Sequence, residues 1–294
     1  MGRRRPRDLR GIRRHLRLPR HGWSNLQSVH LNLPFHSDDE FRRLHAAIRV
    51  ALPLLPALAA SSPIQGRSPS GFLDARLEAY RHNCARVPLV TGHVIPELAR
   101  SPAEYDERIL QPMYRAIAPL DPGGVLQDEW LNARGAIARF DRNTIEIRVL
   151  DIQECPAQDL ALLGFIDALL RALQCGALSP LDEQEALGER ALEQIFLRAI
   201  RDGRFAPAID AAWLSALGLD GKTKSLGDAA AALMHRLGAR DAWWGDGVRF
   251  ILRSGSLAER ILGAMSQGEP LPAIYRRLAE SLAGGIRFEA SANA

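Results

Sequence analysis

Two short segments of this 294-residue chain place ionisable groups on one face of an extended backbone. In residues 143–151, read Asn-Thr-Ile-Glu-Ile-Arg-Val-Leu-Asp, Glu146 and Arg148 alternate with apolar residues. Because successive strand side chains point to opposite faces, the acid and the cation share a surface. Residues 28–33 repeat the pattern and place His30 and Asn32 together. A carboxylate, a guanidinium and an imidazole on such faces indicate either a surface in water or a site for charged groups.

The pattern alone leaves both interpretations open. Most alternating antiparallel strands keep one face in water, and an exposed pair such as Glu146 and Arg148 usually contributes only ~0–1 kcal/mol to stability. His30 by itself carries less information than the pair.

The elements around these residues follow from turn and capping signals. We expect a strand over residues 27–35 and a helix that opens at Ser37, kinked or ended by Pro53 and Pro56. Residues 59–71, rich in Ser, Pro and Gly, predict a loop. The capping box Ser101-Pro102-Ala103-Glu104 predicts a helix over 102–117. Residues 134–141 predict a strand that forms a β-hairpin with the Glu146 strand.

From Pro156 onward the periodicity is helical, with helices expected over 160–173, 183–200, 225–237, 256–268 and 272–283. The sequence therefore predicts an α+β fold: a partial antiparallel β-sheet covered by helices, followed by a helical C-terminal region. We divide the chain into an arm (1–20), a core (21–175) and a helical region of the same domain (176–294).

Composition excludes several classes of protein. At 32.4 kDa and 47% hydrophobic content the chain can bury a sizeable core. It contains neither an apolar run of the ~18 residues that a membrane span needs nor a recognisable secretory signal, so we expect a cytoplasmic protein without a membrane partner. Cys84, Cys155 and Cys175 lack C-x-x-C spacing and predict free thiols.

The positive charge is concentrated at the N-terminus. Residues 1–20 hold nine arginines and one aspartate, so the remaining chain carries −4 against +4 for the whole. Such an arm is typical of nucleic-acid binding, but no aromatic residue lies between its arginines to stack on bases. A wrongly assigned start explains the arm better, and we rank nucleic acid as the least favoured partner.

Four strings in one order carry a family resemblance. They are 28–33 (Ser-Val-His-Leu-Asn-Leu), 58–63 (Leu-Ala-Ala-Ser-Ser-Pro) with Gly66 and Gly71, 74–76 (Asp-Ala-Arg) and 144–151 (Thr-Ile-Glu-Ile-Arg-Val-Leu-Asp). Together, over residues 21–175, they resemble the bacterial glutamate-cysteine ligase family of carboxylate-amine ligases, which has a glutamine synthetase-like fold.

The resemblance implies ATP and Mg²⁺ as cofactors, with glutamate and cysteine or another amine as substrates. The carboxylate becomes an acyl phosphate, and the amine displaces phosphate to form a γ-glutamyl amide. Carried over by position, Glu146 and His30 match metal-binding groups, and Arg148 and Arg76 match catalytic cations near phosphate or the substrate carboxylate. His30, Asn32 and Ser62 match nucleotide-binding positions, and Asp151 is a weaker candidate because its strand parity places it opposite Glu146.

The chain departs from the family before residue 28. The resemblance implies an earlier strand with two or more metal carboxylates, whereas residues 1–27 contain only Asp8 as an acid. We therefore expect a chain that lacks the N-terminal part of the family. Three readings stay open: an active ligase whose missing carboxylates come from elsewhere, a catalytically silent homologue that at most binds nucleotide, and a nucleic-acid-binding protein. An interrupted sheet would also favour homo-oligomers through its unpaired edge.

Overall fold

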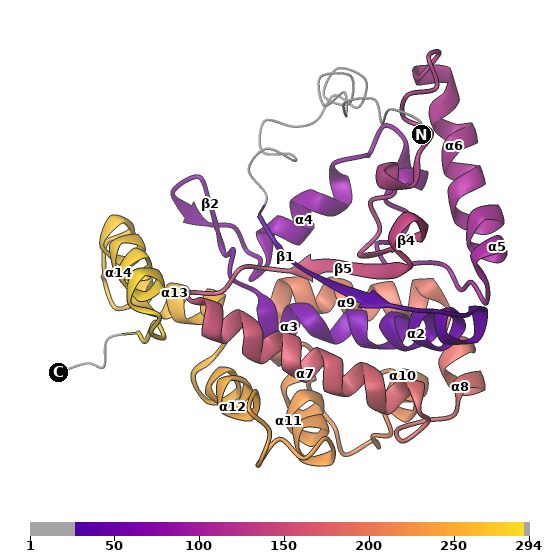
Figure 1. The fold of residues 1–294 in the computed structure, drawn as a ribbon. Helices are drawn as coiled ribbons and strands as arrows, with labels where there is room; N and C mark the ends of the chain where they lie inside the picture. The colour runs from indigo at the N-terminus through magenta and orange to yellow at the C-terminus, as the bar shows by residue number, and fades with distance from the viewer. Residues whose placement is uncertain (1–26, 291–294) are drawn as a thin grey trace.

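A three-stranded antiparallel sheet lies in the middle of the molecule, as the computed structural model, which describes residues 27–290, shows (Figure 1). The strands are β1 (Val29–Pro34), β4 (Ala136–Arg139) and β5 (Thr144–Leu150), in the order β1-β5-β4. The expected hairpin of β4 and β5 is confirmed, and β1 joins it from more than 100 residues away in the sequence. The arm proposed for residues 1–20 lies outside the described residues.

The register of β1 on β5 contains a bulge beside the predicted site. Leu31 pairs with Ile147, but Val29 pairs with Leu150, so β5 contains one more residue than β1 between these two pairs. Asn32, next along β1, pairs with Glu146. A bulge bends the strand locally and re-aims nearby side chains. Asp151 follows the last residue of β5, and strand parity therefore does not decide where its side chain lies.

The helices form a layer against the apolar face of the sheet. Ile145, Ile147 and Val149 on β5 are fully buried, and α2 (Asp38–Ala51) and α3 (Leu55–Ala59) contact this strand. Figure 1 shows α2, α3, α7 and α9 beneath the sheet and α4 above it. The site face of the sheet therefore lies opposite the layer of helices.

The expected α+β fold is confirmed, with differences in detail. The prolines end α2 early through a short 3₁₀ turn before α3, and a π-helical turn, Asp106–Leu110, interrupts the 102–117 helix. Residues 59–71 contain a small hairpin, β2 (Ile64–Gln65) with β3 (Ser68–Pro69). The remaining helices are α4 (Ala75–His82), α5 (Pro102–Tyr105), α6 (Gln111–Ile117), α7 (Pro156–Gln174), α8 (Leu181–Glu185), α9 (Glu189–Asp202), α10 (Ala211–Ala216), α11 (Leu226–Arg236), α12 (Gly245–Ser254), α13 (Leu257–Ser266) and α14 (Leu271–Gly284).

The prediction of one helix over 183–200 was wrong. The chain forms α8 and α9 there, and Gly188 in extended backbone is the N-cap of α9. The alternation of acidic and apolar residues continues through the break, so periodicity alone did not reveal it. The helices α10 and α12 were also not predicted from the sequence.

One apolar core extends from Phe35 to Ile251 and joins the sheet to the later helices. A second, smaller cluster joins α13 and α14, includes the buried Phe288, and has Ile64 of β2 packed against it. None of the helices within residues 27–290 has both the length and the apolar composition that a membrane span requires.

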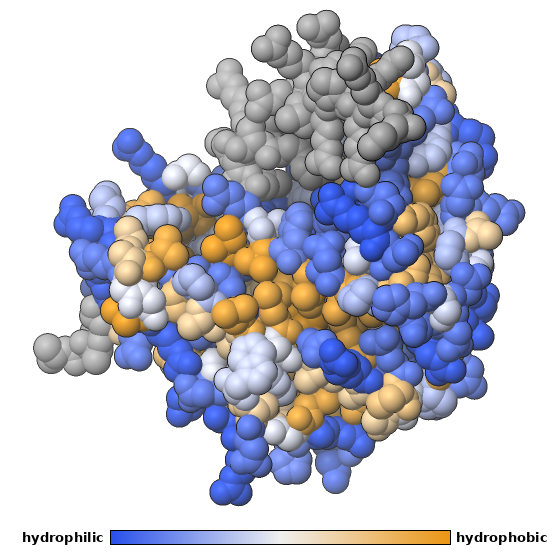
Figure 2. Space-filling view, in the orientation of Figure 1, coloured by the Kyte–Doolittle hydropathy of each residue, from blue (hydrophilic) through white to orange (hydrophobic). Residues whose placement is uncertain are grey.

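β1 is an edge strand among the described residues. Its Pro34 lacks an N–H group, which is typical of an edge, while Val29, Leu31 and Leu33 are only half-buried. Figure 2 shows apolar surface across the middle of this face of the molecule, surrounded by polar residues. The expected association through this edge stays a prediction.

A buried histidine makes the fold sensitive to acid. His45 on α2 is 1% exposed, and neither of its ring nitrogens has a hydrogen-bond partner within residues 27–290. Burial, and then the charge of Arg49, lowers the pKa of His45 from 6.5 to about 3. As the pH falls, the unfolded chain protonates His45 at a higher pH than the folded chain does. His45 therefore does not reduce the free energy of unfolding above pH 6.5, and reduces it increasingly as the pH decreases toward 3. We expect a loss of about 3 kcal/mol between pH 7 and pH 4.5 from this group.

Urea unfolding of wild type and His45→Phe at several pH values measures this effect. The substitution should flatten the stability curve between pH 4.5 and pH 6.5, whereas His36→Gln, at an exposed position, should leave the curve unchanged. An equally steep loss of stability in His45→Phe would exclude His45 as its cause.

Candidate functional site

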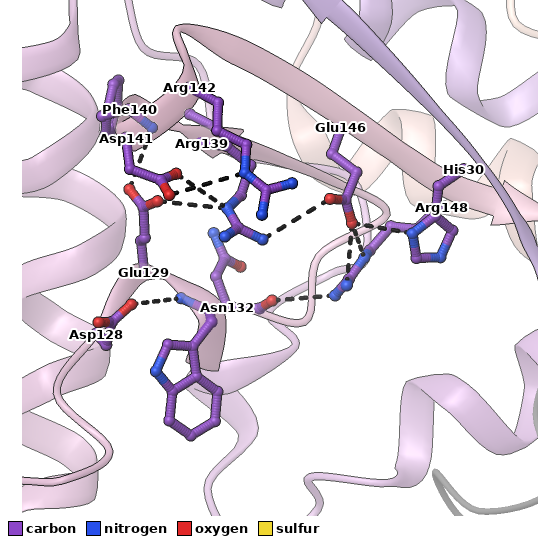
Figure 3. Close-up of polar contacts among 12 residues, drawn as sticks. His30, Asp128, Glu129, Asn132, Arg139, Phe140, Asp141, Arg142, Glu146 and Arg148 are labelled. Atoms are coloured by element: carbon purple, nitrogen blue, oxygen red, sulfur yellow. Dashed lines mark hydrogen bonds and ion pairs between the residues drawn. The ribbon is translucent and has the colours of Figure 1, made fainter. Parts of the chain in front are cut away.

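The predicted imidazole of His30 and the predicted guanidinium of Arg148 both contact the carboxylate of Glu146 (Figure 3). Glu146 Oε1 lies 3.1 Å from His30 Nδ1 of β1 and accepts a hydrogen bond from Arg148 Nε at 3.1 Å. The second interaction joins residues two positions apart on β5, and the first joins adjacent strands. Asn32, the backbone partner of Glu146, is exposed beside them. Alternation gives each strand its polar face, and the pairing of β1 with β5 brings the two faces together.

The surroundings hold Glu146 in its ionised form. The side chain is 7% exposed, and burial alone would raise the pKa of its carboxyl. The hydrogen bond from His30 outweighs this and, with the charge of Arg148, lowers the pKa of Glu146 to about 2. A carboxylate remains at this position at every physiological pH.

This shift predicts a contribution of Glu146 to stability. Because the folded pKa lies below the usual 4.5, the contribution is complete above pH 4.5 and is lost as pH falls toward 2; it amounts to at most about 3 kcal/mol. Denaturant melts of Glu146→Gln should show lower stability at pH 7 and a flatter acid limb. Glu107→Gln, an exposed carboxylate on the π-helical turn, serves as the matched control. Unchanged stability of Glu146→Gln at pH 7 would contradict the assignment.

A second guanidinium reaches Glu146 from β4. Arg139 Nη1 lies 3.8 Å from Glu146 Oε2, and Arg139 Nε lies 3.3 Å from Glu129 Oε1 and 3.7 Å from Asp141 Oδ1. Burial and the hydrogen bond with Asp141 raise the pKa of Glu129. Sequence reasoning missed Arg139, although the signal was present: in the predicted hairpin Ile137 faces Glu146, and Arg139 lies two residues further on the same face.

The other side of the Arg148 guanidinium contacts neutral oxygens. Arg148 Nη1 donates to the hydroxyl of Tyr80 at 3.5 Å and to the carbonyl oxygen of Asn132 at 3.4 Å (Figure 3 shows Asn132). Arg148 is therefore held from two directions, by its carboxylate on β5 and by oxygens outside the sheet.

Arg76 and Ser62 belong to a neighbouring cluster centred on Asp151. The guanidinium of Arg76 donates through Nε to Asp151 Oδ1, and both side chains are almost fully buried. Asp151 Oδ2 accepts from the hydroxyl of Ser62 at 2.7 Å and from the backbone of Ser61 at 2.8 Å. Arg76 Nη1 reaches the carbonyl oxygen of Arg148 at 3.4 Å, so the two clusters share a strand.

A cavity of about 320 Å³ lies beside this second cluster. It is lined by Gln27, Ser61, Ser62, Ile64, Gln65, Gly66, Ala75, Arg76, Ala79, Asp151 and Ile152. Arg76 Nη2 and Asp74 Oδ2 are buried without a partner among the described residues. Burial, and then the charge of Asp151, raises the pKa of Asp74 well above its usual value. The cavity wall thus includes the cationic residue Arg76, whose Nη2 atom is itself buried.

The predicted residues therefore divide into two groups. His30, Asn32, Glu146 and Arg148 come together on the sheet, while Arg76 and Ser62 lie next to them around Asp151. Within residues 27–290 no group of three or more His, Cys, Asp or Glu side chains has the arrangement of a metal site. Glu146 and His30 thus make at most a partial ligand set.

Comparison with a protein-family model confirms the family resemblance of the sequence. The model of the glutamate-cysteine ligase family 2 (GCS2) matches residues 9–281. A protein of Archaeoglobus fulgidus, named "Uncharacterized protein", is 46% identical over 156 residues, which are 53% of this chain and 42% of that relative. The aligned part is thus less than half the length of that relative. Because the family match covers most of the sequence, the chain belongs to glutamate-cysteine ligase family 2.

Proposed function

We propose that this protein is an ATP-dependent carboxylate-amine ligase that forms a γ-glutamyl amide. The observation that carries the proposal is the convergence of Glu146, Arg148 and His30 on one sheet face in a chain of this family. Condensing a carboxylate with an amine requires a leaving group on the carboxyl carbon, which ATP supplies. Phosphoryl transfer between anions in turn requires cations fixed at the reacting groups.

The described residues fit Mg²⁺ only as the companion of a nucleotide. Mg²⁺ keeps several waters and is commonly held by one or two carboxylates together with substrate phosphates. Glu146, ionised and next to the exposed imidazole of His30, suits one such position, but no all-protein cage exists among residues 27–290. When bound, the ion would neutralise phosphate charge beside this carboxylate.

The residues of the chain then divide the work. Arg148, fixed against Glu146, would stabilise negative charge that develops on the transferred phosphoryl group, and Arg139 adds a second positive charge on the same face. His30 and Asn32 would contact the nucleotide. An oxygen of the glutamate side-chain carboxylate attacks the γ-phosphorus as ADP leaves. The amine nitrogen then attacks the carboxyl carbon, loses a proton and expels phosphate.

The cavity beside Arg76 is the proposed pocket for the amino-acid substrate. The positive charge of Arg76 on its wall would attract one carboxylate of the amino acid, and the hydroxyl of Ser62 lies on the same wall. A volume of about 320 Å³ suits a small molecule. Glutamate is the proposed donor, and cysteine or another amine the acceptor.

Release of ADP by the purified chain tests the proposal directly. The reaction should need Mg²⁺, glutamate and an amine together, and mass spectrometry should detect the γ-glutamyl amide. Glutamate labelled with ¹⁸O in the side-chain carboxylate should transfer one label to phosphate. Glu146→Gln should abolish the reaction, whereas Glu107→Gln should retain it.

The alternatives give different results in the same assay. Nucleotide binding without glutamate-dependent turnover by well-folded protein selects a catalytically silent homologue, an outcome that the partial ligand set keeps open. Salt-sensitive binding to duplex DNA that disappears on deletion of residues 1–20 selects the nucleic-acid reading. Sedimentation measures whether copies associate, as proposed for the edge of β1.

A further inference from the structure

Tyr80 lies on α4 one turn after Arg76, so both side chains leave the same face of the helix. The side chain of Tyr80 is buried, at 5% exposure of the residue, and its hydroxyl lies 3.5 Å from Arg148 Nη1. The same hydroxyl donates to the carbonyl oxygen of Arg134 at 3.5 Å. The resemblance assigned no role to this tyrosine.

The start of α4 is fixed at several points. The Asp74 side chain caps the helix by accepting from Leu77 N at 2.8 Å, and Asp74 N donates to Ile200 O of α9 at 2.9 Å. Arg76 N donates to the hydroxyl of Ser62 at 3.1 Å. A helix anchored in this way holds a residue of its second turn in a constant place, and α4 can therefore serve as a rigid support.

The hydrogen bonds of Arg148 show what Tyr80 contributes. Nε and Nη2 of the guanidinium face Glu146 Oε1. The partners of the third nitrogen, Nη1, therefore determine how the guanidinium plane is rotated about this contact. Nη1 has two oxygen partners, the hydroxyl of Tyr80 and the carbonyl oxygen of Asn132. An arginine has ~2 kcal/mol of rotamer entropy, and each partner on a new side reduces the number of accessible rotamers.

We propose that Tyr80 is a positioning residue whose hydroxyl fixes the guanidinium of Arg148 in the plane that meets the transferred phosphoryl group. The inference rests on the proposed ligase function. α4 then supports both halves of the site, since Arg76 faces the amino-acid cavity and Tyr80 holds the cation on the sheet. Tyr80 itself touches no reacting atom.

Tyr80→Phe removes the hydroxyl and keeps the ring that packs in the core. We expect kcat of glutamate-dependent ADP release to fall about 10-fold, with KM for MgATP changed less than about twofold, because the interaction acts on orientation in the transition state. Tyr114→Phe, at a half-buried tyrosine on α6, is the matched control and should retain wild-type kinetics.

A double-mutant cycle with Arg148→Lys separates positioning from a general effect on the core. Lysine lacks the planar fork, so Tyr80→Phe should cost nothing further in the Arg148→Lys background. Equal losses from Tyr80→Phe in both backgrounds would overturn the proposal, because a merely structural tyrosine acts independently of residue 148.

A readout without turnover distinguishes failure of this inference from failure of the proposed function. In protein labelled with ¹⁵N-arginine, the Arg148 side-chain signal is assigned by its loss in Arg148→Lys. Tyr80→Phe should accelerate rotation and hydrogen exchange of the Arg148 guanidinium, while Tyr114→Phe should not. Unchanged guanidinium dynamics in Tyr80→Phe would overturn the positioning role even in an active enzyme. Faster dynamics in a protein that releases no ADP would refute only the ligase function.

Discussion

Replacement of Arg148 by alanine is expected to lower kcat/KM for glutamate-dependent ADP release by ~10³-fold. The guanidinium is largely buried, is fixed by Glu146, and provides the positive charge nearest to the proposed metal-binding carboxylate. A fixed cation in a site that excludes water stabilises developing charge far more than a mobile one in solvent. Steady-state kinetics with varied MgATP and glutamate measure the effect.

Two further variants make this result interpretable. Arg148→Lys keeps the charge without the planar fork and should lose about 10²-fold, between wild type and alanine. Arg142→Ala removes a 53% exposed guanidinium just before the same strand and should change kcat/KM by less than about twofold. An Arg148→Ala enzyme with near-normal kinetics would exclude this residue from catalysis, provided its circular dichroism matches wild type.

Replacement of Arg260 by alanine is expected to destabilise the protein by about 3–5 kcal/mol. Arg260 on α13 donates to Glu154 Oε1 at 2.6 Å, and both residues are only 3% exposed. The guanidinium also donates to the carbonyl oxygens of Gly255, at 3.2 Å, and of Phe288. Its removal leaves a buried carboxylate without its cation and releases the segment that follows α14. Denaturant unfolding gives the free-energy change.

The charge explanation has its own test. Arg260→Ala combined with Glu154→Gln removes both charges and should recover part of the lost stability. Arg171→Ala breaks a pair with Asp167 in which the arginine is 76% exposed, and should cost less than about 1 kcal/mol. If Arg260→Ala were no more destabilising than Arg171→Ala, the buried pair would not stabilise the fold as argued.

Local sequence determined the elements that are set by near neighbours. The alternation in β5 gave a shared face to Glu146 and Arg148 and a buried face to Ile145 and Ile147, because the period of a strand is fixed by its backbone. Ser101 and Ser256 marked true helix starts, because the side chain of each accepts a backbone N–H from the first turn of its helix; Ser256 also completes a capping box with Glu259.

Only the tertiary structure decided which distant groups meet. His30 reaches Glu146 because β1 pairs with β5, and Arg76 reaches Asp151 across 75 positions of sequence. Neither pattern names its partner, because pairing of distant segments depends on how the whole core packs. Tyr80 had no sequence signal, since its role comes from the placement of α4 above the sheet. Local periodicity thus identified candidate site residues. Which of them lie close together depends on tertiary packing, which local periodicity does not determine.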